Sequence, residues 1–191
     1  MPDIKGTRTE QALLAAFAGE SQARSRYTYY ASVARKEGYR QIEELFLETA
    51  DNELQHAKRF FKFLEGGMVE ITAAYPAGVI GNTVQNLKAA ADGEKEEWEA
   101  LYPDAAAVAE EEGFPEVASA FRNIAKVEAK HEARYRKLLA NIENGQVFKK
   151  ETPVAWKCRN CGFVHEGTQA PDMCPACAHP QEHFELFVET Y

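Results

Sequence analysis

The sequence predicts an all-α four-helix bundle with a long crossover between its second and third helices, followed by a small C-terminal domain that holds a metal. Three observations predict this architecture. Four long stretches contain few or no glycines and prolines, their apolar residues recur at helical spacing, and all four cysteines lie near the end of the chain. The 191 residues suffice for one medium domain and one small domain. We expect the bundle at 1–146, a linker at 147–152 and the small domain at 153–191.

Glycine and proline mark the ends of the expected helices. Each glycine-poor stretch is too long for a strand and has the length of a bundle helix, and the four lie at 7–37, 39–65, 82–112 and 116–144. Thr7 and Thr9 are candidate N-caps of the first helix, and Pro115 stands where the fourth helix begins. The connection at 66–81 is long and glycine-rich, so it can carry the chain from one end of the bundle to the other.

The bundle contains an internal repeat. An offset of 75 residues aligns 33–39 with 108–114, and the same register pairs Glu53 with Glu128 and His56 with His131. Upstream, Glu20 aligns with Glu94 at an offset of 74, so the third helix holds one extra residue between Glu94 and Val108. A π-bulge accommodates one extra residue in a helix and is frequent at functional sites. We therefore expect a π-bulge between these two residues.

Charged side chains interrupt the apolar stripes of all four helices. These stripes contain five glutamates and two histidines: Glu20, Glu53, His56, Glu94, Glu97, Glu128 and His131. Burying one ionised carboxylate without a partner costs several kcal/mol, and five would exceed the roughly 5 to 15 kcal/mol by which a domain is stable. The stripes contain no lysine or arginine at these positions, whereas two divalent cations would supply four positive charges. A Glu-x-x-His motif also places both side chains on one helix face.

A single Glu-x-x-His motif is most often a solvated pair on a helix surface. Two such motifs at repeated positions, each preceded by another glutamate in an apolar stripe, favour a pair of metal ions instead. The assignment of Glu97 depends only on the helix face that it shares with Glu94, because its counterpart in the repeat is Ala23. Oxygen and nitrogen ligands of this kind suit iron or manganese better than a structural zinc, and they favour redox chemistry over hydrolysis.

Two tyrosines are candidates for hydrogen bonding to the ligand carboxylates. Tyr27 lies two turns after Glu20, and Tyr102 lies near the expected bulge. Both are equally well interpreted as core aromatic residues whose hydroxyls find partners elsewhere.

The cysteines form two Cys-x-x-Cys motifs separated by twelve residues, with thiols at Cys158, Cys161, Cys174 and Cys177. This pattern predicts one tetrahedral ion, and both iron and zinc accept four thiolates. Gly162, Phe163 and Pro175 within or beside the motifs favour iron, because backbone N–H groups in such turns can stabilise the sulfur ligands. His165, His179 and His183 are expected to be surface residues, since four cysteines already complete the coordination.

The charge and hydropathy of the chain limit its partners and its compartment. Thirty acidic and 22 basic residues give a formal charge of -8, which opposes binding to nucleic acid. No stretch approaches the apolar length of a membrane helix, and the first residues lack the features of a signal peptide. We therefore expect a cytoplasmic protein with no membrane or nucleic-acid partner, in which clustered thiols bind metal.

Taken together, the motifs resemble those of the rubrerythrin family over essentially the whole chain. Residues 1–146 resemble its ferritin-like di-iron domain through the seven glutamates and histidines named above, and residues 153–191 resemble rubredoxin through the four cysteines. Ala178 differs from the pattern, because rubredoxins usually carry glycine at this position.

The resemblance implies a non-haem iron peroxidase that protects against oxidative stress by reducing hydrogen peroxide to water. It implies three irons per chain, one di-iron pair and one rubredoxin-type iron that relays electrons from rubredoxin or from an NAD(P)H-dependent reductase. It also implies a homodimer with electron transfer between chains. His56 and Glu97 are the residues that would exchange at one iron, and a carboxylic acid or tyrosine, with Glu97, Tyr27 and Tyr102 as candidates, would assist proton delivery.

Two other interpretations remain from the sequence. In one, the chain is a ferritin-like protein that oxidises and handles iron and carries an electron-transfer tail. In the other, the tail is a zinc ribbon that recruits a partner, so the bundle is the only redox centre.

Overall fold

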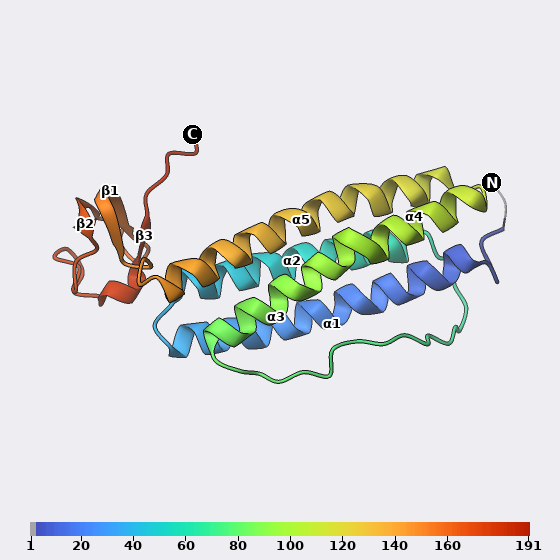
Figure 1. The fold of residues 1–191 in the computed structure, drawn as a ribbon, viewed down its shortest axis with the longest axis horizontal. Helices are drawn as coiled ribbons and strands as arrows, with labels where there is room; N and C mark the ends of the chain where they lie inside the picture. The colour runs from blue at the N-terminus through green and yellow to red at the C-terminus, as the bar shows by residue number, and fades with distance from the viewer. Residues whose placement is uncertain (1–2) are drawn as a thin grey trace.

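The computed structural model describes residues 3–191, so residues 1 and 2 of the expected bundle domain lie outside it. Four long helical stretches form the predicted bundle (Figure 1): α1 (Arg8–Lys36), α2 (Arg40–Phe61), a continuous helix made of α3 (Thr83–Glu96), η1 (Glu97–Leu101) and α4 (Tyr102–Glu111), and α5 (Pro115–Glu143). The expected second helix was too long, because its last turn tightens into i to i+3 hydrogen bonds after Phe61. None of the helices described has the length and hydrophobicity that a membrane span requires.

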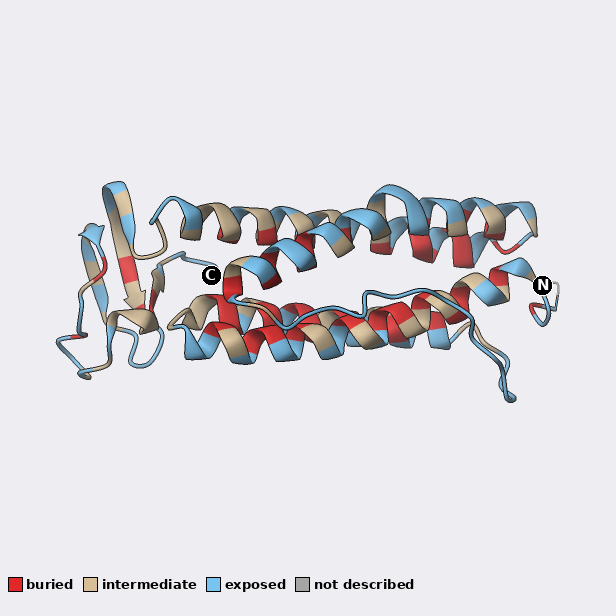
Figure 2. Cartoon of the chain, turned by 60° about the horizontal axis from the view of Figure 1, so that its bottom comes forward, coloured by how far each residue is buried: buried red, intermediate tan, exposed pale blue. Residues whose placement is uncertain are grey.

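The crossover between α2 and α3, residues 62–82, runs along the outside of α1 and α3 (Figures 1 and 2). Most of its residues are exposed. The hydroxyl of Tyr75 nevertheless donates a hydrogen bond of 2.6 Å to the carbonyl of Ala15 on α1. This bond attaches the middle of the crossover to the bundle.

The hydrophobic core is divided into two clusters, and the buried faces of the helices point toward each other (Figure 2). Tyr27, Phe46 and Leu87 belong to one cluster, and Phe60 and Phe121 belong to the other. Glu20, Glu53, Glu94 and Glu128 belong to neither cluster, although all four are buried. The apolar core therefore contains an embedded layer of charge.

The two halves of the repeat cap each other's helices. A carboxylate oxygen of Glu112, after α4, accepts the backbone N–H and the hydroxyl of Thr9 at the start of α1, at 2.9 and 2.6 Å. Glu37, its counterpart after α1, accepts the backbone N–H of Thr83 at the start of α3, at 2.9 Å. Each half thus satisfies a first-turn donor of the other half, where a negative charge is favoured.

The π-helical segment η1 confirms the bulge predicted between Glu94 and Val108. It lies between Glu94 and Tyr102, whereas the corresponding interval from Glu20 to Tyr27 on α1 is regular α-helix. The extra residue therefore enters one half of the repeat only. Because the bulge absorbs the extra residue, Tyr102 occupies the position in its half that Tyr27 occupies in the other. The bulge also changes the helix face on which Glu97 lies.

The small domain contains a three-stranded antiparallel sheet in the order β2-β1-β3, with strands β1 (Lys149–Cys158), β2 (Val164–Gln169) and β3 (Phe184–Leu186) and the short 3-10 helix η2 (Gln181–His183). Strand β1 begins at Lys149, within the expected linker at 147–152, and Lys149 pairs with Gln169. The register then shifts before Val154, so this part of the strand is irregular. An ion pair of 3.0 Å between Arg40 of α2 and Glu182 of η2 links the two domains.

Replacing Glu112 with glutamine is expected to lower the melting temperature of the bundle by a few degrees at neutral pH, because the start of α1 loses a negatively charged hydrogen-bond acceptor. Hydrogen bonds from Thr9 and Arg8 lower the pKa of Glu112 to about 2. A lowered pKa in the folded state stabilises the protein above the unfolded pKa of about 4.3, and this contribution disappears as the pH falls toward 2. The difference between variant and parent, followed by circular dichroism at 222 nm, should therefore shrink between about pH 5 and pH 2.

Glu111→Gln is the matched control, because Glu111 is an exposed neighbour that pairs only with Arg8. Equal melting temperatures for the Glu112 variant and the parent at neutral pH would contradict the capping role.

Candidate metal centres

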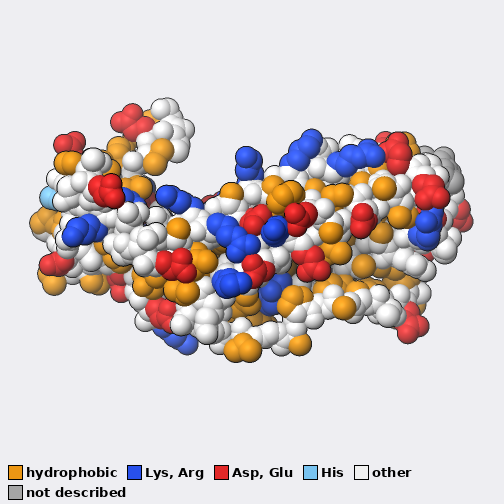
Figure 3. All heavy atoms as spheres, in the orientation of Figure 1, with side chains coloured by type: hydrophobic (Ala, Val, Ile, Leu, Met, Phe, Trp, Pro, Cys, Tyr) orange, Lys and Arg blue, Asp and Glu red, His pale blue; other side chains and the backbone are white. Residues whose placement is uncertain are grey.

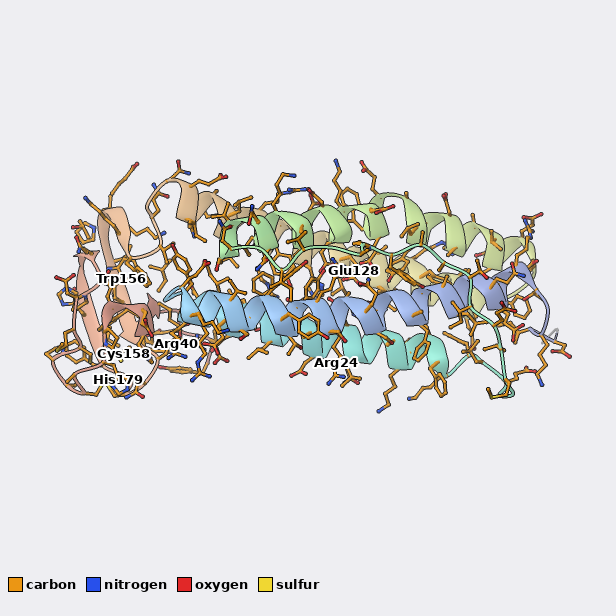
Figure 4. The ribbon with its side chains drawn as sticks, turned by 90° about the horizontal axis from the view of Figure 1, so that it is seen from below. Arg24, Arg40, Glu128, Trp156, Cys158 and His179 are labelled. Atoms are coloured by element: carbon orange, nitrogen blue, oxygen red, sulfur yellow. The ribbon has the colours of Figure 1, made fainter. Side chains whose placement is uncertain are left out.

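The helices bring six of the seven predicted bundle ligands, all except Glu97, together in the buried layer of charge, whose position midway along the bundle is marked by Glu128 in Figure 4. One group consists of Glu20, Glu53, His56 and Glu128, and a second consists of Glu53, Glu94, Glu128 and His131. In each group the ligand atoms lie within 4.8 Å of one another. Because Glu53 and Glu128 belong to both groups, the layer provides two adjacent metal positions that share two carboxylates.

Both histidines direct Nδ1 into this layer. Nδ1 of His56 lies 2.9 Å from Glu53 and 2.9 Å from Glu128, and Nδ1 of His131 lies 2.8 Å from Glu128 and 3.2 Å from Glu53. Burial lowers the pKa of both histidines, but hydrogen bonds to Glu128 and Glu53 outweigh it and raise the pKa of His56 to about 9 and of His131 to about 12. Protons on these nitrogens occupy the direction in which a metal would bind.

The layer contains four buried glutamates and only two histidines to compensate them. Burial raises the pKa of Glu20, and it raises the pKa of Glu94 to about 8. Oxygens of Glu20 and Glu94 have no hydrogen-bond partner among the described residues, the carboxylates of Glu53 and Glu128 face the two histidines, and no lysine or arginine of residues 3–191 is buried. Such unpaired carboxylate oxygens are costly unless cations bind to them, so the donor set fits two iron ions.

The two tyrosine hydroxyls donate to ligand carboxylates across the repeat. Tyr27 on α1 donates to Glu94 on α3 at 2.6 Å, and Tyr102 on α4 donates to Glu20 on α1. Each tyrosine thereby orients a carboxylate of the other half and occupies one of its oxygens. Their part in the chemistry stays a prediction.

Glu97 lies apart from both groups of ligand atoms. It is the first residue of η1, it is only partly buried, and it lines a cavity together with Tyr102. Burial of its carboxyl group and the neighbouring charge of Glu94 raise its pKa. In the observed conformation the Glu97 oxygens belong to neither group of ligand atoms, and the role of Glu97 as a ligand stays a prediction.

Asn52 is a residue of this site that the sequence pattern did not single out. Its amide oxygen lies 3.2 Å from Nε2 of His131, so an Nε2–H donor directs the Nδ1 lone pair into the layer. The position equivalent to Asn52 in the repeat is Val127, which offers His56 no such acceptor. The two histidines are thus held differently, and only the offset between the repeats would have revealed this from the sequence.

The four cysteines converge as predicted in the small domain, at the end of the bundle where Figure 4 places Cys158 and His179. Sγ of Cys158 lies 3.8 Å from Sγ of Cys177, and Sγ of Cys161 lies 3.7 Å from Sγ of Cys174. A tetrahedron with metal–sulfur bonds of about 2.3 Å has edges of about 3.8 Å, so the sulfurs already have the spacing that one ion requires. Although burial opposes it, a hydrogen bond from the backbone N–H of His179 lowers the pKa of Cys177 to about 6.

Two equivalent turns close the Cys-x-x-Cys motifs. Gly162 has φ of 80° and donates its N–H to the carbonyl of Cys158, and Ala178 has φ of 56° and donates to the carbonyl of Cys174. Ala178 therefore adopts the left-handed conformation that favours glycine. Ala178 retains the hydrogen bond of this turn at the cost of backbone strain.

Comparisons with known proteins cover both centres. The family model described as Rubrerythrin matches residues 11–139, and the model of the rubrerythrin rubredoxin-like domain matches residues 156–185. The chain is 63% identical over 188 residues to a rubrerythrin of Porphyromonas gingivalis, covering 98% of this chain and 94% of that protein. It is 55% identical over 186 residues to a rubrerythrin of Nitratidesulfovibrio vulgaris, covering 97% of each.

The fold is also similar to solved structures. The fully reduced, all-ferrous state of nigerythrin matches with a TM-score of 0.64 and 30% identity, covering 96% of this chain and 91% of that chain. The reduced symerythrin of Cyanophora paradoxa matches with a TM-score of 0.63 at 23% identity over 74% of this chain and 89% of that one, which shows the fold alone.

Replacing Ala178 with glycine is expected to stabilise the small domain by up to about 1 kcal/mol, because glycine adopts positive φ without strain. The measurement is the urea midpoint at which the iron-loaded protein loses its visible ferric–thiolate band. Ala176→Gly serves as the control, since Ala176 does not share the positive φ. A midpoint for the Ala178 variant at or below that of the parent would contradict the proposed strain.

Proposed function

The chain belongs to the rubrerythrin family, with a di-iron domain and a rubredoxin-like iron domain, and from this we propose that it is a peroxidase that reduces hydrogen peroxide to water. The observation that carries the proposal is the presence of two separate metal centres in one chain. One is a layer of shared carboxylates and histidines suited to two irons, and the other is a set of four thiols suited to one iron.

The stoichiometry of peroxide reduction suits this pair of centres. One hydrogen peroxide takes up two electrons and two protons and forms two molecules of water as its O–O bond breaks. When bound, two ferrous ions supply both electrons together. The remaining task of the chain is to position ligands, to admit peroxide and to provide protons.

Glu97 and Tyr102 are the residues that we assign to the peroxide side of the di-iron layer. Both line the same cavity, and the Tyr102 hydroxyl is hydrogen-bonded to Glu20 within the layer. Burial and the neighbouring charge of Glu94 raise the pKa of the Glu97 carboxyl group, which favours its protonated form. A protonated carboxyl group next to a hydrogen-bonded hydroxyl can pass protons to the oxygen that leaves.

His56 is the ligand that we assign to exchange with Glu97. His131 is held by Asn52, whereas the corresponding Val127 offers His56 no acceptor for Nε2. A histidine whose ring has a partner only at Nδ1 moves more readily than one whose Nε2 is also hydrogen-bonded.

We further propose that the four-cysteine iron relays electrons, one at a time, from an external donor such as rubredoxin or an NAD(P)H-dependent reductase. Along α5, His131 lies about 18 Å from the helix end at Glu143, beyond which the small domain begins. This separation favours a homodimer in which the small domain of one chain serves the di-iron site of the other. Phe61 and Leu54 on α2 are exposed apolar residues, 58% and 39% accessible, that a second copy would cover.

The cytoplasm is the compartment that we propose, because it keeps the four thiols reduced.

Iron oxidation and storage is the alternative function. It would use the same di-iron layer, with oxygen rather than peroxide as the oxidant. Glu97, whose counterpart in the other half of the repeat is Ala23 and not a carboxylate, and the appended four-cysteine domain favour the peroxidase instead.

The peroxidase proposal predicts that hydrogen peroxide oxidises the anaerobic, fully reduced protein at least tenfold faster than air-saturated buffer does. Stopped-flow absorbance at the ferric–thiolate band and at the di-iron band measures both irons. The control is the protein reconstituted with zinc in place of iron, which should show neither change. Faster oxidation by oxygen would instead support iron handling.

Replacing Cys174 with serine is expected to abolish turnover driven by the reductase, because the relay loses a sulfur ligand. A pre-reduced di-iron site should still consume one equivalent of peroxide per chain. Rapid-mixing assays of peroxide loss, without and with reductase, distinguish these events. Loss of the single turnover as well would contradict a tail that only relays electrons.

Replacing Glu97 with alanine is expected to leave most metal binding intact and to slow the reaction with peroxide by about 10²-fold or more, as expected for loss of a proton-transfer group. Glu99→Ala is the matched control, since Glu99 is an exposed residue of the same helical segment and does not line the cavity. Metal content is measured by elemental analysis and the rate by stopped flow. An unchanged rate in the Glu97 variant would remove its proposed role.

A further inference from the structure

A cavity of about 490 Å³ lies between α1, the helix formed by η1 and α4, and residues 73–76 of the crossover. Its lining extends along α1 from Ala12 to Arg26, about 21 Å of helix length. Because α1 and α4 run in opposite directions, one end of the cavity has Arg26 and Gly93 and the other has Ala12 and Val108. The cavity is therefore elongated along the bundle axis.

The walls of this cavity differ along its length. Glu97 and Tyr102, which we place on the peroxide side of the di-iron layer, belong to its lining. Toward the far end the walls consist mostly of small or apolar side chains, Ala12, Ala15, Ala16, Ala105, Val108 and Phe121, with Asp104 as the charged residue among them. A polar oxidant therefore finds hydrogen-bonding groups at one place and apolar surface beyond it.

The volume exceeds what hydrogen peroxide needs. A water molecule occupies about 30 Å³ in the liquid, and hydrogen peroxide is only slightly larger. Sites that bind organic molecules have volumes of about 300 to 1,000 Å³ and mostly apolar walls with a few polar groups. The size and lining of this cavity match that class.

Tyr75 covers the middle of the cavity. Its hydroxyl is held by the carbonyl of Ala15, and its ring lies over Gly19, where a Cβ atom would meet the ring at 3.5 Å. Figure 3 shows hydrophobic side chains along the lower edge of the molecule, where the crossover runs in Figure 1. The cavity is therefore covered by one hydrogen bond and by the contact between the Tyr75 ring and Gly19, and not by a packed apolar core.

We propose that this cavity binds the alkyl or aryl group of an organic hydroperoxide, with the O–O group directed to Glu97 and Tyr102. The proposal rests on the peroxidase function and extends its substrate class. The O–O bond of the hydroperoxide breaks, the oxygen attached to carbon becomes an alcohol, and the other oxygen becomes water. Two electrons from the reduced iron pair and two protons complete the reaction.

Cumene hydroperoxide and its product, 2-phenylpropan-2-ol, provide the test. The alcohol should bind the full-length chain reconstituted with zinc in place of iron, as measured by ligand-observed NMR. Ala105→Leu, which fills the apolar end, should weaken this binding at least tenfold. Ala107→Leu is the matched control on the same helix, because Ala107 is exposed and outside the cavity, and it should leave binding unchanged. If the alcohol binds the Ala105 and Ala107 variants equally well, the proposal is overturned. It is also overturned if binding of the alcohol is lost when higher protein concentration makes a second copy of the chain associate.

Single-turnover rates of the anaerobic, reduced protein then separate the two substrates. Ala105→Leu should slow oxidation by cumene hydroperoxide at least tenfold and leave oxidation by hydrogen peroxide unchanged. Tyr75→Ala, which opens the cover, should accelerate the reaction with cumene hydroperoxide. If only hydrogen peroxide oxidises the parent protein, the peroxidase function stands and this inference fails; if neither hydroperoxide does so, the function itself fails.

Discussion

The embedded layer of carboxylates is the constraint on which the rest of the structure depends. Four buried glutamates face two histidines and no buried lysine or arginine among the described residues, so ionising all four carboxyl groups in an apolar core requires bound cations. The helices must therefore converge to bind metal as well as to bury apolar surface. The aromatic clusters on either side exclude water and hold the helices at the spacing that the shared carboxylates require.

Repeat symmetry builds this layer, and departures from the symmetry give its two sides different properties. Tyr27 and Tyr102 donate to carboxylates of opposite halves, and Glu37 and Glu112 cap helices of opposite halves. The bulge enters only one half and places Glu97 beside the layer, whereas Ala23 is its counterpart. The side of the layer that borders the cavity, where Glu97 lies, thus belongs to the half with the bulge, because an extra residue in a helix changes which faces its side chains occupy.

The two metal centres use different elements for different tasks. Long helices hold the di-iron ligands rigidly, while tight turns of the small domain bring four thiols to the spacing of one ion. The ion pair between Arg40 of α2 and Glu182 of η2 is a polar contact between the domains that carry the two centres.

The sequence by itself determined the helices, the repeat, the seven charged positions in the apolar stripes and the four thiols, because these depend on local spacing. Helical periodicity places Glu128 and His131 on one face whatever surrounds them. Only the tertiary structure decided which carboxylates are shared, which hydroxyl meets which glutamate and that Asn52 contacts His131. It also decided that Lys149 begins a strand rather than continuing a linker, and that the crossover encloses a cavity. These features depend on distances between segments far apart in the chain, which packing sets and local periodicity does not.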